Sequence, residues 1–554
     1  MKLYKIFLYA FLFIGIFSSC EDDLNIELED DDDLLAEDVF NTPDGYERAI
    51  AGVYANLSVV GLDGPGTSNI AGIDAGTGQY VRGLFNLQNL STDETIWTFE
   101  NDPGIRQIQR NQWDANNVVV LGFWARATFE ISLANEFLRQ TTDAKLDERG
   151  VSGELRNTIT AYRAEARVLR ALANYHLLDL FRRAPFATEE DAVGFTRVPE
   201  IAGQDLFNYI EAELLAADAD LIDVATGNAA TYGRVNKGVA KMILAKLYLN
   251  AGVYLGDENQ RFADCLRVCE EIINSGYSLT PNYLYNFLAD NDTNGAQNEI
   301  IFPVIADGTT VRNFGGAGIL IQGQMNARSG FQPTPESLGV GGFGNLYRVR
   351  RQFAELFVND ALFNNDSRNT VVSQDIELDD MGNIVTQEDR PIEIADISDT
   401  SGGYLLAKYS NITSAGEPGK DATFVDTDFP LFRFADVLLM YAEAHLNNGG
   451  GDRATALGYV NDLRERAFGD ASGNIADADL TLDFILDERA RELHWECHRR
   501  QDLIRFGQYS GGTYNWTYKG GPQNGSAISE NLDLFPVPAS SRSANPNLGQ
   551  NTGF

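Results

Sequence analysis

Apolar side chains recur at helical spacing along most of this chain, and this periodicity constrains its fold most. Val120, Phe123, Ala127 and Ile131 fall three or four residues apart and so lie on one face of a helix. By the same pattern, the expected helices cover residues 117–140, 155–181, 205–221, 236–250, 262–274, 432–446, 453–467 and 481–506. Helices with one apolar face bury it by stacking on a neighbour. The sequence predicts a mostly all-α fold of tetratricopeptide-like helical hairpins, without a strict repeat consensus.

The middle of the chain has a different composition. Residues 280–420 are rich in Gly, Asn, Asp and Thr, with short β-like runs such as 299–305. This favours loops and small hairpins, which are suitable places for binding chemistry. We therefore expect helical hairpins packed against a loop-rich region with a few short strands. The expected parts are a helical region 37–280, a loop-rich insertion on the ligand side 281–431 and a carboxyl-terminal helical region 432–554, whose last sixteen residues should be irregular.

The bulk composition restricts the classes of partner. The formal net charge is −37, and such a surface repels phosphate backbones, so we expect no nucleic-acid partner. With 44% hydrophobic residues, the chain can bury a sizeable core. Cys265 and Cys269 share one helix face and are expected in the core, and the cysteines form no disulfide framework.

The amino terminus has the pattern of a cleaved leader. Lys2 and Lys5 precede an apolar run over 6–17, shorter than the roughly 20 residues that span a bilayer. We expect a signal peptide over 1–19. Cys20 follows two serines and resembles the lipobox of bacterial lipoproteins, where this residue is acylated and anchors the chain to a membrane. The alternative is a plain secretory signal with an incidental cysteine.

An acidic segment follows this cysteine. Glu21-Asp22-Asp23 and the run 29–33 make residues 20–36 a charged tether, since like charges extend a linker. Acidic residues directly after the lipidated cysteine also resemble the export signal that sends Bacteroidetes lipoproteins to the cell surface.

The carboxyl-terminal third contains several long motifs in a fixed order. They occupy 432–444 (FRFADVLLMYAEA), 461–467 (NDLRERA), 488–505 and 535–551. Their order and spacing resemble the SusD/RagB family of nutrient-binding outer-membrane lipoproteins. The amino half matches more loosely, over 163–181 and 233–249. Two positions depart from the family: Arg182 and Cys497 stand where it has glycine, so we expect the turn after residue 181 to differ.

The resemblance implies both a fold and a role. It implies a mostly helical fold with four tetratricopeptide-like hairpins, and a lid-like place on a SusC-like TonB-dependent transporter. It also implies an oligosaccharide ligand, bound at a shallow surface site without cleavage and without a cofactor. The expected location is the outer membrane, facing the cell exterior, through the lipid anchor at Cys20. Alternatives are a peptide or other nutrient, as in the RagB branch, a surface glycoside hydrolase, and a structural surface protein that uses its repeats for protein contacts.

Catalytic patterns are weak in this sequence. A glycosidase needs two closely spaced carboxylates, but with 80 acidic residues chance pairs are certain, and none lies in a hydrolase motif. No nucleophile elbow, phosphate loop or dinucleotide fingerprint occurs. We therefore expect a binding protein and not an enzyme.

Two histidines of the last expected helix have the spacing of a zinc pair. His494 and His498 are four residues apart, but the order His-Glu-x-x-His is missing, so we expect no metal site. Charged residues around them recur at helical spacing and are better explained as a structural ion-pair network. Its expected members are Arg489, Glu492, Glu496, Arg499, Asp502 and Arg505.

Sugar binding needs an aromatic face for the pyranose ring and polar side chains for its hydroxyls. In better-known members of the family, a loop equivalent to 61–113 holds ligand-stacking tryptophans. Here that loop offers Trp97 as the first candidate, with packing onto the core as the alternative for Trp97 and Trp113. The ligand-binding candidates are Tyr80, Arg82, Asp93, Trp97, Asn101 and Trp113 in this loop, and Asn313 and Phe314 in a second segment, 307–331.

Overall fold

The computed structural model describes residues 36–61, 63–194, 197–342 and 347–554. The expected signal peptide, Cys20 and nearly all of the expected tether lie outside this part of the chain. The chain divides into two units, residues 1–48 and residues 49–554. The described part of the first unit contains α2 (Ala36–Val39), and α3 (Pro43–Ser58) begins in it. The remaining helices and strands and the candidate site lie in the second unit.

The expected helices of the amino half are present, with ends close to those predicted. Asn117 caps α6 and Asn236 caps α10, each accepting two main-chain N–H groups of the first turn with its side chain. Asp205 lies inside the first turn of α9 and does not cap it. The helices are α4 (Tyr80–Gln88), α5 (Ile105–Gln109), α6 (Val118–Gln140), α7 (Asp143–Glu148), α8 (Gly153–Phe181), α9 (Gly203–Ala217), α10 (Lys237–Leu249), α11 (Ala251–Leu255) and α12 (Phe262–Ile273).

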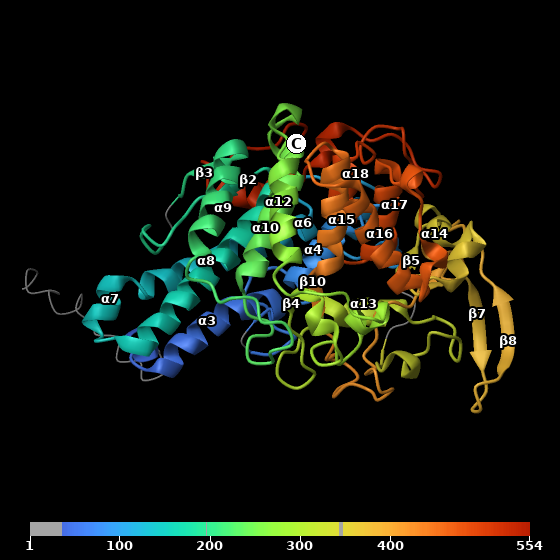
Figure 1. Ribbon diagram of the computed structural model, residues 1–554, viewed down its shortest axis with the longest axis horizontal. Coiled ribbons are helices and arrows are strands. Elements are labelled where there is room, and N and C mark those ends of the chain that lie inside the picture. The colour runs from blue at the N-terminus through green and yellow to red at the C-terminus, as the bar shows by residue number, and fades with distance from the viewer. Residues whose placement is uncertain (1–35, 62, 195–196, 343–346) are drawn as a thin grey trace, which may run out of the picture. The chain divides into compact units, whose positions relative to one another are not determined.

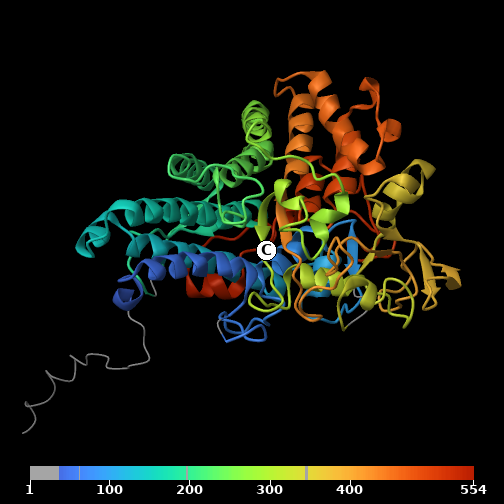
Figure 2. The same ribbon diagram turned by 60° about the horizontal axis from the view of Figure 1, so that its bottom comes forward.

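The carboxyl-terminal helices complete a mostly helical fold, as predicted. They are α15 (Phe434–Leu446), α16 (Arg453–Phe468), α17 (Leu482–Leu493), α18 (Arg499–Arg505) and the short α19 (Ala539–Ala544). The helices pack in sequence: α6 on α8, α8 on α9, α10 on α12, α12 on α15 and α15 on α16. Figures 1 and 2 show α10, α12, α15 and α16 side by side, with loops of the middle segment at one end of them. The expectation of a fully irregular end is wrong, because α19 lies within it.

The middle segment contains the short strands that were expected, and two helices that were not, α13 (Gly316–Gln324) and α14 (Arg351–Val358). The described strands form five antiparallel pairs. They are β1 (Thr95–Trp97) with β5 (Tyr347–Val349), β4 (Ile300–Val304) with β10 (Phe429–Arg433), β2 (Arg183–Pro185) with β3 (Glu200–Ala202), β6 (Val371–Val372) with β9 (Leu405–Leu406), and β7 (Gln374–Leu378) with β8 (Ile384–Asp389).

The expectation of one helix over 481–506 is wrong. Helix α17 ends at Leu493 and α18 begins at Arg499, because Trp495 and Cys497 adopt left-handed φ values of 61° and 67°. The main-chain N–H of Trp495 donates to the Glu94 carboxylate at 3.1 Å instead of continuing the helix. His494 and His498 therefore do not share a helix face. Among the described residues, no group of His, Cys, Asp and Glu side chains is arranged to hold a metal ion.

The turn after α8 keeps the conformation of a glycine, against our expectation. Arg182 has φ 58° and ψ 6°, the left-handed end of a helix, and its N–H donates to the Leu178 carbonyl at 3.0 Å. Its guanidinium donates to the carbonyls of Leu178, Asp179 and Val253, and these bonds help to hold the turn.

None of the described helices is long and apolar enough to cross a bilayer.

Candidate ligand-binding site

One arginine joins the two segments that were predicted separately as ligand-binding. Arg82 lies in the first turn of α4, and its Nη1 donates to the Phe314 carbonyl at 3.3 Å. Its Cζ lies 5.7 Å from the centre of the Trp97 ring. The Gln79 side chain holds the two segments together. Its Oε1 accepts the main-chain N–H of Arg82 at 2.8 Å and that of Gly316 at 3.1 Å. The start of α4 is thus tied to the start of α13.

A glycine makes room for that arginine. A Cβ atom at Gly76 would overlap the Arg82 guanidinium and would lie 3.3 Å from the Asp74 carboxylate. The loop before α4 therefore passes directly beside Arg82 and brings an exposed carboxylate, Asp74, to the same place. Arginine and carboxylate together can donate to and accept from sugar hydroxyls.

Trp97 lies below the surface and does not offer an open ring face to a ligand. It is 5% exposed. Its ring centre lies 4.6 Å from that of Tyr347, its partner in the β1–β5 ladder, and its Nε1 donates to Asp102 at 2.9 Å. Phe99, two residues later, is 50% exposed with its ring 6.3 Å from Trp97. Asn101 is also exposed, in the turn that follows.

The second segment adds the exposed Phe314, which packs on the half-buried Phe424. Phe314 is 42% exposed, and its ring centre lies 5.2 Å from that of Phe424. The Arg312 guanidinium lies 5.5 Å from the Phe424 ring centre. Asn313 is half-buried, with its Oδ1 accepting the Gly315 N–H at 2.7 Å. Exposed aromatic edges beside arginine, asparagine and carboxylate groups fit a polar, ring-shaped ligand.

Three other candidates lie inside the protein and offer no face to a ligand. Tyr80 is buried, and its hydroxyl bonds His176 Nδ1 at 2.8 Å, where burial lowers the pKa of His176 to about 3. Trp113 packs on Phe535 with ring centres 4.5 Å apart. Burial opposes ionisation of Asp93, but Arg499 outweighs it and holds the pKa of Asp93 below its usual value. Their buried contacts explain these three residues without a ligand, so they are not part of the candidate site.

The six charged residues predicted as a network all form ion pairs, and all of them are buried except the half-buried Arg505. Arg489 contacts Asp436 at 2.8 Å and Asp502 at 2.9 Å, and Arg505 contacts Asp502 at 2.8 Å. Glu492 contacts Arg466 at 2.6 Å, Glu496 contacts Lys408 at 2.6 Å, and Arg499 contacts Asp93 at 2.6 Å. These contacts join α15, α16, α17 and α18 to the middle segment and the 61–113 loop. These ion pairs account for the six charged residues without a ligand.

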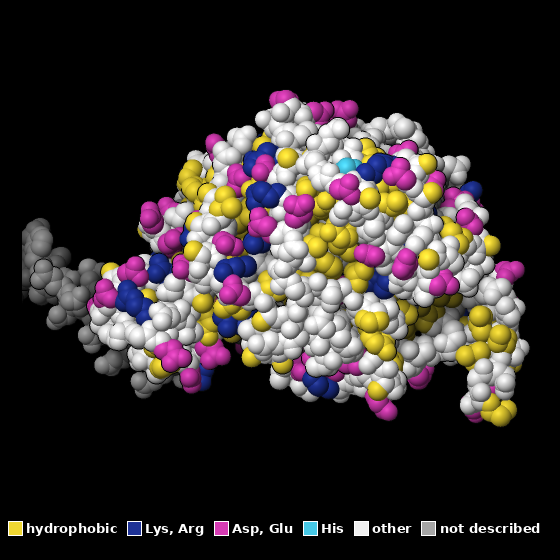
Figure 3. Space-filling view, in the orientation of Figure 1, with side chains coloured by type: hydrophobic (Ala, Val, Ile, Leu, Met, Phe, Trp, Pro, Cys, Tyr) yellow, Lys and Arg dark blue, Asp and Glu magenta, His cyan; other side chains and the backbone are white. Residues whose placement is uncertain are grey.

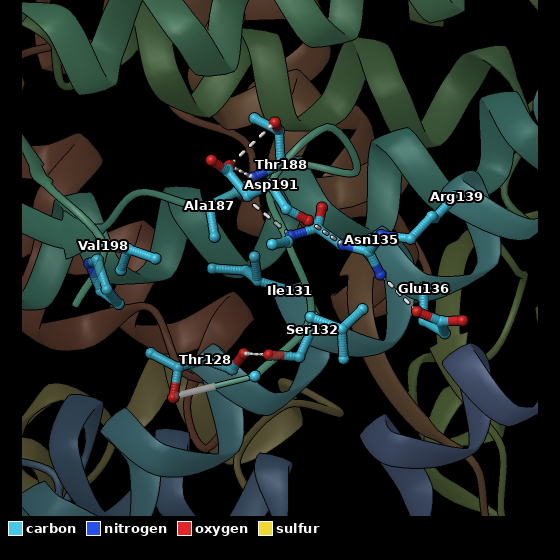
Figure 4. A pocket seen from close by; sticks show the side chains of 14 residues that line it. Thr128, Ile131, Ser132, Asn135, Glu136, Arg139, Ala187, Thr188, Asp191 and Val198 are labelled. Carbon is cyan, nitrogen blue, oxygen red and sulfur yellow. Dashed lines mark hydrogen bonds and ion pairs between the residues drawn. The ribbon is translucent and has the colours of Figure 1, made fainter. Parts of the chain in front are cut away.

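A hollow elsewhere on the molecule differs in its lining from the candidate ligand-binding site. It lies between α6 and the segment 185–198 and has a volume of about 480 Å³. Figure 4 shows Ile131, Ala187 and Val198 around it, with Arg139 paired to Glu136. The described residues that line it include no aromatic ring, so this part of the lining offers no stacking surface for a pyranose.

Comparisons with known proteins show the family of this chain. A model of the SusD family matches residues 366–554. The starch-binding protein SusD of Bacteroides thetaiotaomicron is 32% identical over 528 residues, which cover 90% of this chain and 91% of that protein. This chain belongs to the SusD family. SusD-like protein P25 of Formosa agariphila is 27% identical over 530 residues, which cover 92% of this chain and 90% of that protein.

Solved structures show the same SusD fold. A crystal structure of a SusD homologue from Bacteroides thetaiotaomicron matches with a TM-score of 0.71 at 20% identity, covering 94% of this chain and 98% of that one. Surface glycan-binding protein A of the same species, in complex with laminarihexaose, matches with a TM-score of 0.64 at 17% identity, covering 92% and 99%. SusD and surface glycan-binding protein A are named for binding and not for catalysis.

Sequence reasoning missed part of the site of this SusD-family chain. Phe99 lies two residues after Trp97 in the sequence, and its position in a polar turn was a usable signal. Arg312 lies in the predicted segment 307–331 but was not chosen. Phe424 carried no sequence signal, since only the fold brings it to Phe314.

Proposed function

We propose that this protein binds a glycan at the surface formed by Arg82, Trp97, Phe99, Asn101 and Phe314, with Asp74, Asn313 and Phe424 at its margin. The observation that carries the proposal is the position of Arg82, which contacts Trp97 on one side and Phe314 on the other. Exposed rings stack on the apolar face of a sugar, and the neighbouring polar groups bond its hydroxyls.

The ligand we propose is a neutral glucan. The net charge of −37 disfavours anionic polysaccharides. The relative with 32% identity is named for starch. Native gel electrophoresis with and without amylopectin in the gel tests this directly: the wild-type protein should migrate more slowly in the amylopectin gel, relative to an inert marker protein. Equal relative mobility in both gels would exclude starch-type glucans and direct the search to other glycans, or to peptides as in the RagB alternative.

The place of this function in the cell is also a proposal. We propose that the chain is lipidated at Cys20, faces the exterior at the outer membrane and passes its ligand to a SusC-like TonB-dependent transporter. The leader pattern, the acidic segment after Cys20 and membership of the SusD family support this role. The test is purification of the tagged chain from detergent-solubilised outer membranes, followed by mass spectrometry. A TonB-dependent transporter should co-purify in near-equal amount, and its absence under mild detergent would contradict the proposal.

A further inference from the structure

The hairpin of β7 and β8 exposes a cluster of aliphatic side chains. Ten large hydrophobic residues are exposed among those the structure describes, and four of them lie here: Leu378, Met381, Ile384 and Val385. Met381 is 83% exposed and Ile384 is 57% exposed. Figure 1 shows the hairpin projecting from its neighbours, and Figure 3 shows hydrophobic side chains gathered on it. Apolar surface concentrated in this way marks an interaction site.

This hairpin is an ordered scaffold. At its tip, the Asp379 carboxylate accepts the N–H groups of Met381 at 2.9 Å and Asn383 at 2.8 Å. At its base, the buried Asp375 accepts from Arg390 Nη1 and from Asn326 Nδ2, both at 2.7 Å. The aliphatic side chains are therefore presented on a fixed surface.

The two faces of the hairpin differ in chemistry. Leu378 stands opposite Ile384 in the ladder, while Glu377 stands opposite Thr386. Glu377 and Leu378 are consecutive in β7, so their side chains point to opposite faces. The ladder shifts its register there and skips Val385 of β8, which leaves Ile384 with Leu378 on one face and Thr386 with Glu377 on the other. Glu388 shares the face of Glu377. Residues 374–389 contain no Lys or Arg and six acids: Asp375, Glu377, Asp379, Asp380, Glu388 and Asp389. Arg328, from outside the hairpin, pairs with Asp375 at 3.0 Å and with Glu388 at 2.6 Å, and the hairpin stays acidic overall.

The outer edge of β8 is open. The Ile376 carbonyl accepts the Gln332 N–H at 2.8 Å, so it points away from β8. In an antiparallel ladder, its partner Gln387 must then direct its own N–H and C=O to the outer edge of β8. Among the described residues, β8 pairs with β7 alone. An open edge of this kind is a template for another strand.

We propose that β8 accepts an extended segment of a partner protein as a third strand. Its apolar side chains lie on the Leu378–Ile384 face and its lysines or arginines lie on the Glu377–Glu388 face, in alternation. Strand addition supplies main-chain hydrogen bonds, and the alternating side chains supply specificity. The acidic residues select the partner: they repel a second copy of the hairpin and an anionic lipid surface, and they attract a basic strand.

The test uses two labelled peptides of about eight residues. One alternates valine and lysine, and the other has the same composition with all valines before all lysines. Fluorescence anisotropy measures their binding to the purified protein at about 150 mM salt, which screens general attraction to the acidic surface. The alternating peptide should bind at least about tenfold more tightly, as expected from a few extra main-chain hydrogen bonds.

Two variants locate the binding. Gln387→Pro removes the outward N–H and the side-chain bond from Gln387 to Gln374 at 2.8 Å, but it removes no main-chain hydrogen bond between β7 and β8. Ile384→Ser removes apolar contact. Each should weaken binding of the alternating peptide several-fold to about tenfold. Leu215→Ser, at a position on α9 that is 55% exposed, is the matched control and should change nothing. If the proline variant has an altered circular dichroism spectrum, Ile384→Ser alone decides.

Three outcomes would overturn the proposal. Equal binding of the two peptides would mean only general charge attraction. Unchanged affinity in the folded variants would place the peptide elsewhere. A dimer in sedimentation analysis that Gln387→Pro abolishes would assign the edge to a second copy of this chain.

Discussion

The guanidinium carbon of Arg82 lies 5.7 Å from the ring centre of Trp97, while its Nη1 donates to the Phe314 carbonyl. This arrangement joins a loop of the amino half to the middle segment. The rings of Phe99 and Phe314 are exposed, and Trp97 is buried. The proposed glycan site needs this contact between the two segments.

Arg499→Ala should strongly destabilise the protein. The guanidinium contacts the buried Asp93 carboxylate at 2.6 Å, and its removal leaves that charge without a cation at a cost of about 3–5 kcal/mol. Urea unfolding followed by circular dichroism measures the loss. The control is Arg453→Ala, which breaks a partly exposed pair with Asp477 and should cost at most about 1 kcal/mol. Equal stability of the two variants would show that the buried network is not needed for the fold.

Glu130→Gln should stabilise the protein at neutral pH and above. Burial raises the pKa of Glu130 to about 8 from its ordinary 4.5, so folding takes up a proton at this carboxyl. The contribution of Glu130 to the free energy of unfolding is therefore full below about pH 4.5 and is lost as the pH rises through 8. The loss is up to about 1.4 kcal/mol per unit of pH between these values. The stability advantage of the glutamine variant should grow from pH 5 to pH 8, by about 2–4 kcal/mol in thermal or urea unfolding.

The control for that series is Glu136→Gln, on the same helix, where the side chain reaches solvent. If the gap between wild type and Glu130→Gln stays constant over the same pH range, Glu130 does not titrate as its burial implies.

Cys20→Ala should release the protein from membranes. Without the thiol there is no acylation site, and no described helix can replace the anchor. Cell fractionation and immunoblotting should find the variant in the aqueous fraction. Ser19→Ala, which keeps the cysteine, is the control. Undiminished membrane retention of Cys20→Ala would mean that something other than the lipid holds the chain there.

Local signals made much of the fold predictable. Asn117 and Asn236 mark helix starts in the sequence because capping depends on neighbouring residues. The break between α17 and α18 was hidden, since contacts with distant residues such as Glu94 hold Trp495 in its left-handed conformation. The burial of Trp97 depends in the same way on Tyr347. The residue types of the site could be predicted, but their exposure could not.

Calorimetric titration of the purified protein with maltoheptaose tests the central claim most directly. Wild type should bind. Arg82→Ala and Phe314→Ala, with unchanged circular dichroism, should each bind at least about tenfold more weakly, since a stacking or hydrogen-bonding group worth 1–2 kcal/mol is lost. Val193→Ala, at the hollow beside α6, should bind as wild type does. If folded Arg82→Ala and Phe314→Ala both bind like wild type, the glycan site lies elsewhere and the proposed site is contradicted.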